Sequence, residues 1–425
     1  DVSKLVELSF GIFGKSGTGK TFLGNLLAGY LVLYDSALRQ GEDRRVKLLI
    51  FDMHSEYALE LKSPTTPMFA DGVAKIFAHQ FKRYTPDVDL ARERGLELLK
   101  VKFSALNVDD LNLIAPIFGV TETFLRHLPS FRHVLKDKMK LKDLWVWGLL
   151  IDSYSEDILK SSPEGMHVLK EVFDRAGVSN AEEFRSCVLK IVEEKYGRGA
   201  AFSFQSQAPK LRLLIKYPFT EQYDAVEELV GNLLSKDGCH VSISLGRYER
   251  DTPFYMVLAN LVARKLHEKV LELSEKGEEL KVRVVIFLEE AHNFLGSGVY
   301  RLSPFGAIAR EMRKKGITLC VIDQRPSELD KDVVSMLWTN FVFSLTDKSD
   351  ISSAIYGAPR SELFSKLIPL LRSKEVFVYG ESVKFPIVVS VKDYKQAEAR
   401  FKAFVDQSLS SYKDKEAMLR ESGLL

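Results

Sequence analysis

Apolar and polar positions along the chain follow two patterns. Short runs that are almost wholly apolar predict strands buried in a parallel sheet, and longer runs with apolar residues three or four positions apart predict helices. The predicted strands are residues 5–13, 46–52, 241–245, 282–290, 317–323, 340–345 and 375–379, with 210–217 as a weaker candidate and 385–391 as the end of a terminal hairpin. The predicted helices are residues 22–34, 254–273 and 303–315. This alternation predicts an α/β fold with a doubly wound, mostly parallel sheet and antiparallel additions.

The middle of the chain departs from this alternation. Residues 96–196 have helical spacing and few strand signals, while residues 63–88 contain three prolines and read as a loop. We therefore divide the chain into a first half of an α/β core (1–90), a mostly helical insertion (91–205), the second half of the core (206–391) and a charged helical tail (392–425). Trp145 and Trp147 lie in the insertion, where we expect them to be core residues.

A phosphate-binding loop follows the first predicted strand. Residues 14–21, GKSGTGKT, match the pattern G-x-x-x-x-G-K-[ST] between a strand and a helix. The predicted nucleotide-binding residues of this loop are Gly14, Lys15, Ser16, Gly17, Thr18, Gly19, Lys20 and Thr21. The glycines let backbone N–H groups approach phosphates, Lys20 can reach the β- and γ-phosphates, and the Thr21 hydroxyl can bind Mg²⁺. The loop therefore predicts a site for ATP and Mg²⁺.

Acidic residues end two of the predicted strands. Strand 282–290 ends in Glu289 and Glu290, and strand 46–52 ends in Asp52, with Glu56 shortly after it. The carboxyl ends of parallel strands line the ligand crevice of such sheets. We assign Glu289 to the Mg²⁺ side and Glu290 to activation of the attacking water. Asp52 and Glu56 are candidates to hold the water, the metal or a neighbouring subunit, and the alternative is a polar corner of the chain.

A glutamine and several basic residues complete the candidates. Gln324 follows strand 317–323, where it can sense the γ-phosphate or hydrogen-bond the water. The net charge is only +2, so any surface for nucleic acid must be a local patch. Residues 126–142 and 185–198 carry Lys, Arg and His that could contact a phosphate backbone, and the alternative is a solvated helix face.

The cysteines, the absence of long apolar runs and the first residues bear on the cellular compartment and on whether the sequence is a fragment. Three well-separated cysteines form no metal-binding pattern and suggest buried thiols in a reducing compartment. No apolar run approaches the ~20 residues of a membrane span, and no signal peptide is visible, so we expect a cytoplasmic protein without a membrane partner. Because the chain begins with Asp1 almost on the first strand, we expect it to be a fragment that an N-terminal domain can precede.

Six segments together resemble the HerA–FtsK superfamily of ring-forming DNA-pumping ATPases, and HerA most closely. They are GKSGTGKT (14–21), FDMHSEY (51–57), FLEEAHNFL (287–295), AREMRKKGI (309–317), IDQRPSELD (322–330) and TNFVFSLTDKSD (339–350). The resemblance implies a RecA-like core and a hexameric ring that moves along double-stranded DNA. It also implies a NurA-type nuclease as partner in DNA end processing.

Site roles follow by position from the same resemblance. Glu290 takes the catalytic glutamate position and Gln324 the sensor position. Arg313 matches the arginine that the family supplies in trans to the next subunit's γ-phosphate, with Arg310 as the competing candidate. The chain departs from the family at Glu289, which replaces an aspartate, and at Ser55 and Met312, which replace glycines; the family's N-terminal barrel is not within these 425 residues.

Two other functions fit much of the same sequence. A related ATPase that powers protein secretion, pilus formation or complex assembly would have nearly the same motor. A regulatory nucleotide switch with little turnover is a third possibility, although the acid pair and Gln324 argue against it. Stimulation of hydrolysis by DNA distinguishes the first function from the other two.

Overall fold

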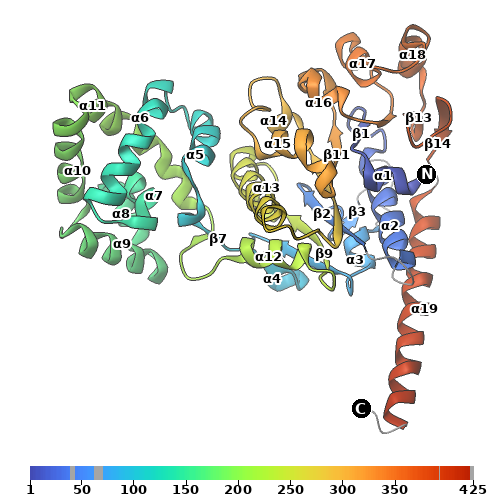
Figure 1. The fold of residues 1–425 in the computed structure, drawn as a ribbon, viewed down its shortest axis with the longest axis horizontal. Helices are drawn as coiled ribbons and strands as arrows, with labels where there is room; N and C mark the ends of the chain where they lie inside the picture. Colours follow the sequence, from blue (N-terminus) through green and yellow to red (C-terminus); the bar gives the residue numbers. More distant parts are fainter. Residues whose placement is uncertain (39–43, 62–69, 392, 422–425) are drawn as a thin grey trace. The chain divides into compact units, whose positions relative to one another are not determined.

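The computed structural model describes residues 1–38, 44–61, 70–391 and 393–421. The chain forms two compact units (Figure 1). The core unit comprises Asp1–Leu98, Leu229–Glu249 and Leu266–Leu425, and the helical unit comprises Leu99–Glu228 and Arg250–Lys265. The predicted insertion, residues 91–205, therefore lies in the helical unit except for its first residues.

The core unit is built on a ten-stranded sheet with the order β14-β13-β12-β1-β11-β10-β2-β9-β5-β6. The strands are β1 (Phe10–Phe13), β2 (Arg45–Asp52), β5 (Phe81–Thr85), β6 (Glu97–Leu98), β9 (His240–Ser244), β10 (Val282–Glu289), β11 (Ile317–Asp323), β12 (Thr339–Val342), β13 (Glu375–Gly380) and β14 (Ile387–Ser390). The run from β12 to β6 is parallel, and β13 and β14 add an antiparallel hairpin at one edge. The predicted doubly wound, mostly parallel sheet is thus confirmed.

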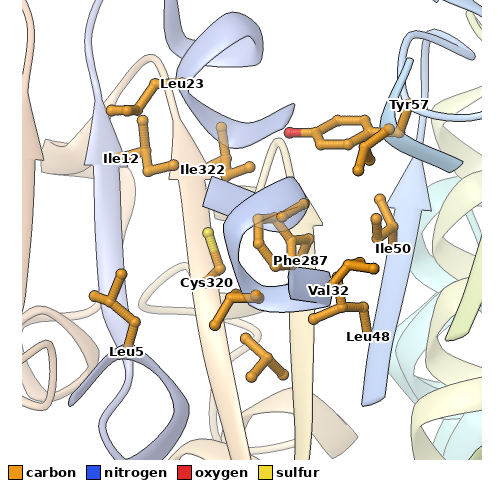
Figure 2. Close-up of a cluster of buried hydrophobic side chains, with 14 of the residues drawn as sticks. Leu5, Ile12, Leu23, Val32, Leu48, Ile50, Tyr57, Phe287, Cys320 and Ile322 are labelled. Atoms are coloured by element: carbon orange, nitrogen blue, oxygen red, sulfur yellow. The ribbon is translucent and has the colours of Figure 1, made fainter. Parts of the chain in front are cut away.

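Helices cover both faces of this sheet. On one face, α1 (Val2–Glu7), α2 (Lys20–Leu38), α3 (Val73–Ile76) and α19 (Tyr394–Glu421) pack on alternate residues of the strands. Figure 2 shows part of this cluster, in which Val32 of α2 lies beside Leu48 and Phe287. On the other face, Phe51 of β2 packs edge-on against Phe305 of α15 (Pro304–Glu311) at a centroid distance of 5.6 Å. Burial on both faces explains why the central strands are mostly apolar and do not alternate between apolar and polar residues.

Shorter elements of the core unit lie between these strands in the sequence. They are β3 (Glu60–Leu61) with β4 (Ala70–Asp71), α4 (Val88–Arg94), α14 (His292–Leu295), α16 (Lys331–Ser335), α17 (Lys348–Ala354) and α18 (Ser361–Leu367). Two helices, α12 (Ala225–Leu234) and α13 (Thr252–Glu275), each run from the helical unit into the core unit.

The helical unit contains seven α-helices that lie wholly within residues 99–228, a range that is fully described. They are α5 (Val108–Ile114), α6 (Glu122–His133), α7 (Trp145–Leu150), α8 (Ser153–Leu159), α9 (Pro163–Ala176), α10 (Ala181–Tyr196) and α11 (Arg198–Gln207), and a short parallel pair joins β7 (Val101–Lys102) to β8 (Phe219–Thr220). Trp145 and Trp147 are both buried, as predicted. The Trp147 indole N–H donates to Glu221 Oε1 at 2.7 Å, so the buried ring keeps a polar partner.

Internal ion pairs occupy part of the basic segments of the helical unit. Arg126 pairs with Glu122, and Arg198 pairs with Glu193. The two basic segments, residues 126–142 and 185–198, contact each other where the Lys195 ammonium lies 2.6 Å from His133 Nε2. Contact of these segments with a phosphate backbone stays a prediction.

Three predictions of secondary structure were wrong. Residues 5–13 are a strand only from Phe10, because α1 occupies Val2–Glu7 and its N-terminus is capped by the Asp1 carboxylate. Residues 63–88 contain β5, a strand inside the sheet whose pattern Lys82 and Arg83 obscure; positions 62–69 are outside the described residues. Residues 210–217 are not a strand, because Ala208–Lys216 forms a 3₁₀ helix with Leu211 and Leu214 buried at three-residue spacing.

The remaining local predictions concern the ends of elements and the cysteines. The predicted helical tail is α19, and residues 392 and 422–425 of the predicted range are outside the described part. Cys320 is buried as expected, whereas the free thiols of Cys187 and Cys239 are partly exposed. Among the described helices, none combines the length and apolar character needed to cross a bilayer.

Candidate nucleotide-binding site

The phosphate-binding loop joins β1 to the N-terminus of α2. Gly14 has φ +157° and Gly17 has φ +76°, and a Cβ at Gly14 would lie 2.9 Å from Thr18 Oγ1 and against the Phe343 side chain. The loop is fastened to neighbouring strands: Gly14 N–H donates to Asp323 O and Lys15 N–H to Ser344 O, both at 3.3 Å. The start of a 19-residue helix therefore faces the loop, which favours bound anions.

Lys20 is the cation of the site. Its ammonium donates to the carbonyl oxygens of Gly14 at 2.7 Å and Lys15 at 2.9 Å. Burial lowers the pKa of Lys20 to about 8, against the opposing effect of the nearby carboxylates of Glu290, Asp323 and Glu289. Phosphate groups bound in the loop would favour the charged ammonium.

Glu289 ends β10 and is almost completely buried. Its Oε2 accepts a hydrogen bond from Met53 N–H at 3.1 Å, which ties β10 to the end of β2. Burial, followed by the charges of Asp52 and Glu56, raises the pKa of Glu289 well above its usual value. A cation bound beside this carboxyl would favour its ionised form.

Asp52 organises the loop after β2. Its carboxylate accepts hydrogen bonds from the N–H groups of Glu56, Tyr57 and Ala58 at 2.8–3.0 Å and from the Ser244 hydroxyl at 3.1 Å. Burial raises the pKa of Asp52 to about 7 in spite of these donors. Asp52 is fully buried behind the pocket wall, whereas Glu56 lies in that wall.

Glu290 and Gln324 meet at the ends of β10 and β11. Gln324 Nε2 donates to Glu290 Oε1 at 2.6 Å. Glu290 has φ +47° and Ser55 has φ +60°, both in the left-handed region that non-glycine residues seldom adopt. The conformation of Ser55 gives a physical reason for the glycine that the related motif carries at that position.

A pocket of about 260 Å³ brings these groups together. Its wall includes nine predicted site residues, namely Ser16, Gly17, Gly19, Lys20, Thr21, Glu56, Glu289, Glu290 and Gln324. It also includes four residues to which the sequence assigned no role: Phe22, His54, Leu61 and Ile322. Gly14, Lys15 and Thr18 shape the loop without lining the pocket. His54 belongs to the motif FDMHSEY, and its place in that motif could have indicated a position in the pocket wall.

Arg310 and Arg313 lie away from this pocket. They precede β11, whose first residue Ile317 pairs with Val284 at the amino end of β10, whereas the pocket is at the carboxyl ends. The Arg313 guanidinium lies 5.3 Å from the centre of the Trp338 ring, and the Arg310 guanidinium lies 5.0 Å from that of Tyr300. A seven-residue strand of about 20 Å separates these arginines from the pocket of their own chain.

Two further residues beside the pocket were missed by the sequence reasoning. Asp323 ends β11 and contacts His292, and together with Glu290 they offer ligand atoms within 4.8 Å of one another. Asp323 is an acid at the carboxyl end of an apolar strand, and this position could have indicated a residue near the site. Thr21 and Glu289 remain the predicted Mg²⁺ ligands, since Mg²⁺ prefers hydroxyl and carboxylate oxygens.

Comparisons with known proteins bear on the fold and on the family resemblance. The family model described as "Helicase HerA, central domain" matches residues 1–184. Over part of its length, this chain is similar to HerA helicases. DNA double-strand break repair helicase HerA of Pyrococcus furiosus is 30% identical over 144 residues, which are 32% of this chain and 26% of that protein. The HerA helicase of Sulfolobus acidocaldarius is 26% identical over 247 residues, 56% of this chain and 47% of that protein. The HerA-like chain thus spans between about a quarter and a half of the length of these two relatives.

Solved structures support the fold independently. The bacterial conjugative coupling protein TrwB, in its unbound monoclinic form, aligns with a TM-score of 0.51 and 13% identity over 91% of the HerA-like chain and 85% of TrwB. TrwB in complex with the non-hydrolysable ATP analogue ADPNP gives a TM-score of 0.51, with 14% identity over 92% and 86% of the two chains. The predicted resemblance and the P-loop ATPase fold are therefore confirmed.

Proposed function

We propose that this HerA-like protein binds ATP with Mg²⁺ and hydrolyses it. The observation that carries the proposal is the pocket in which the phosphate loop, Lys20, Glu289, Glu290 and Gln324 converge from the carboxyl ends of three neighbouring strands. A nucleotide's phosphates would lie on the loop N–H groups, with the Lys20 ammonium against the β- and γ-phosphates.

Thr21 and Glu289 would hold Mg²⁺, which neutralises charge on the phosphate oxygens when bound. Both residues line the pocket, and their hard oxygen donors suit this ion. Glu290 would accept the proton of the attacking water, and the Gln324 amide, hydrogen-bonded to Glu290, would help to orient that water. These assignments are proposals for this chain.

We further propose that hydrolysis drives movement along double-stranded DNA by a ring of identical subunits, with a NurA-type nuclease as a possible partner. The support is similarity to proteins named DNA double-strand break repair helicases. The placement of Arg313 supports a ring, because the length of β11, about 20 Å, separates this arginine from the pocket of its own chain and leaves it available to another subunit. A head-to-tail contact that closes would bring the two together.

The ATPase rate with and without linear double-stranded DNA tests this function. We would measure it at low and at moderate salt, on protein whose mass in solution is known, with Lys20→Ala and Glu290→Gln as controls. Stimulation that declines with salt is expected, because DNA backbone contacts release counterions. A confirmed ring without stimulation would favour a secretion or assembly ATPase, and slow hydrolysis unaffected by any polymer would favour a nucleotide switch.

Mixed rings test the trans role of Arg313. Subunits with Arg313→Ala and subunits with Glu290→Gln are each expected to be inactive alone, and mixing them should restore some hydrolysis at interfaces where both groups are intact. Arg310→Ala is the matched control, since this arginine lies one helical turn away. Suppose that confirmed mixed rings with Glu290→Gln subunits recover hydrolysis when the other subunit is Arg310→Ala but not when it is Arg313→Ala. That result would assign the trans role to Arg310.

A further inference from the structure

Asp323 and His292 lie next to Glu290 and Gln324 but outside the wall of the pocket. We propose that Asp323 and His292 form a positioning pair that fixes Glu290 and Gln324 at the phosphate end of the site. The inference rests on the proposed ATP hydrolysis and identifies the residues that hold its catalytic groups. Neither member of the pair needs to touch the nucleotide.

The Asp323 carboxylate fastens two loops together. Its Oδ2 accepts a hydrogen bond from the backbone N–H of His292 at 2.7 Å, and its Oδ1 accepts one from Arg325 N–H at 2.8 Å. His292 Nδ1 lies 3.0 Å and 3.2 Å from the two carboxylate oxygens. Asp323 is almost fully buried, so these bonds replace the water that an exposed carboxylate would have. One side chain thus connects the loop after β10 with the loop after β11.

These two loops carry the catalytic groups. Glu290 immediately follows β10, Gln324 immediately follows β11, and their side chains share the 2.6 Å hydrogen bond. The Asp323 carbonyl also accepts the bond from Gly14 N–H, so the same residue reaches the phosphate loop. A shift at Asp323 would therefore change the spacing between the phosphate loop, Glu290 and Gln324.

The backbone conformation of Glu290 explains why the positioning pair is needed. Its left-handed conformation, at φ +47°, costs of the order of 1 kcal/mol or more for a residue with a side chain. Such a conformation persists only where the surroundings enforce it. The Asn293 N–H and side-chain amide both donate to Glu290 O at 3.1 Å. His292, which lies between Glu290 and Asn293 in the chain, is held by its N–H bond to Asp323.

The His292 ring adds an electrostatic contact. Its Nδ1 lies 3.7 Å from Glu290 Oε2 while it also contacts Asp323. The ring therefore stands between the buried carboxylate and the proposed base. Replacing the ring by a methyl group removes both side-chain contacts and keeps the backbone N–H bond from residue 292 to Asp323.

His292→Ala and His292→Asn separate positioning from a general structural role. The Asn amide can reach about the place of Nδ1 and donate to Asp323, whereas Ala cannot. We expect His292→Ala to lower kcat about tenfold to a hundredfold, in keeping with the cost of misplacing a catalytic group, and to change KM and the affinity for ATP less than twofold. We expect His292→Asn to recover most of the lost kcat. The exposed His167 of the helical unit provides the control His167→Ala, with kcat unchanged.

The outcomes distinguish this inference from the proposed function. If the wild-type protein, confirmed as folded, hydrolyses no ATP, the proposed function fails. If an active wild type and His292→Ala share the same kcat, or if Ala and Asn lose equally, the positioning pair is overturned. A crystal structure of His292→Ala gives a readout that needs no activity: we expect Glu290 to leave the left-handed region or to lose its bond to Gln324. An unchanged Glu290 in that structure would overturn the inference.

Discussion

Gly24, in the first turns of α2, provides a test of how the helix that carries Lys20 packs on the sheet. A Cβ at this position would overlap the Tyr57 hydroxyl oxygen and would lie 3.2 Å from Tyr57 Cζ. Tyr57 is fully buried in the cluster under α2 (Figure 2). Its hydroxyl has no hydrogen-bond partner among the described residues. Gly24→Ala therefore creates overpacking at one identifiable atom.

Two effects of opposite sign determine the stability of Gly24→Ala. Alanine in a helix interior gains about 0.5–1 kcal/mol over glycine, while overpacking costs about 1–3 kcal/mol. We expect net destabilisation of the core unit by about 1–2 kcal/mol. In a Tyr57→Phe background the overlapping oxygen is absent, so the same substitution should be neutral or stabilising. The coupling between the two sites should be about 1–3 kcal/mol.

Gly231→Ala is the matched control. Gly231 lies in α12, and a Cβ there would meet no atom within 4 Å. This variant should stabilise the protein by about 0.5–1 kcal/mol, which measures the helix effect alone. Tyr57→Phe alone should be neutral or stabilising, because it removes a buried hydroxyl without a partner among the described residues.

Calorimetry and urea denaturation would measure the unfolding of the core unit in all five proteins, the wild type, the three single variants and the double variant. Equal destabilisation by Gly24→Ala with and without the Tyr57 hydroxyl would refute the reasoning, as would a Gly24→Ala protein more stable than the wild type. A loss of ATP affinity that follows the loss of stability would show that the packing of α2 also sets the position of Lys20.

Three further predictions concern charged groups. Because burial lowers the pKa of Lys20 to about 8, binding of ATP in the absence of Mg²⁺ at pH 8.5 should take up part of a proton; calorimetry in two buffers of different ionisation enthalpy would show unequal heats, and equal heats would contradict this. The hydrogen bond to Asp323 raises the pKa of His292, so its stabilising effect should be complete below about pH 6.5 and lost as pH rises through the raised pKa; a stability difference from His292→Asn that is constant across this range would be inconsistent with it. In the helical unit, Asp110→Ala should lower the free energy of unfolding by about 3–5 kcal/mol, because it leaves the largely buried Arg264 without the carboxylate 2.8 Å away. A loss of unfolding free energy below about 1 kcal/mol, measured by calorimetry, would contradict the argument.

The strands at the centre of the sheet were predictable because their environment is uniform. Nearly all residues of β2, β10 and β11 are buried, so each strand is a mostly apolar run, interrupted at few positions such as Lys47 and Arg283, that can be identified without knowledge of its neighbours. The strand β5 was missed because its central positions carry Lys82 and Arg83, which are partly exposed. Its place between β9 and β6 is decided by pairing with β9, which lies far away in sequence.

The sequence by itself determined the chemistry of the phosphate loop. Glycines, a lysine and a threonine at fixed spacing act through local backbone geometry, and most of these positions do line the pocket. The acids after β10 were also predictable, since a strand's carboxyl end has a known place in such folds.

Only the tertiary structure decided which side chains meet. Asp52 and Glu56 are four residues apart, yet one is a buried organiser of the loop and the other lines the pocket. Gln324 meets Glu290, and Asp323 meets His292, because β10 and β11 are neighbours in the sheet. These contacts join residues more than 30 positions apart, and their geometry depends on strand order and register, which no local pattern of residues contains.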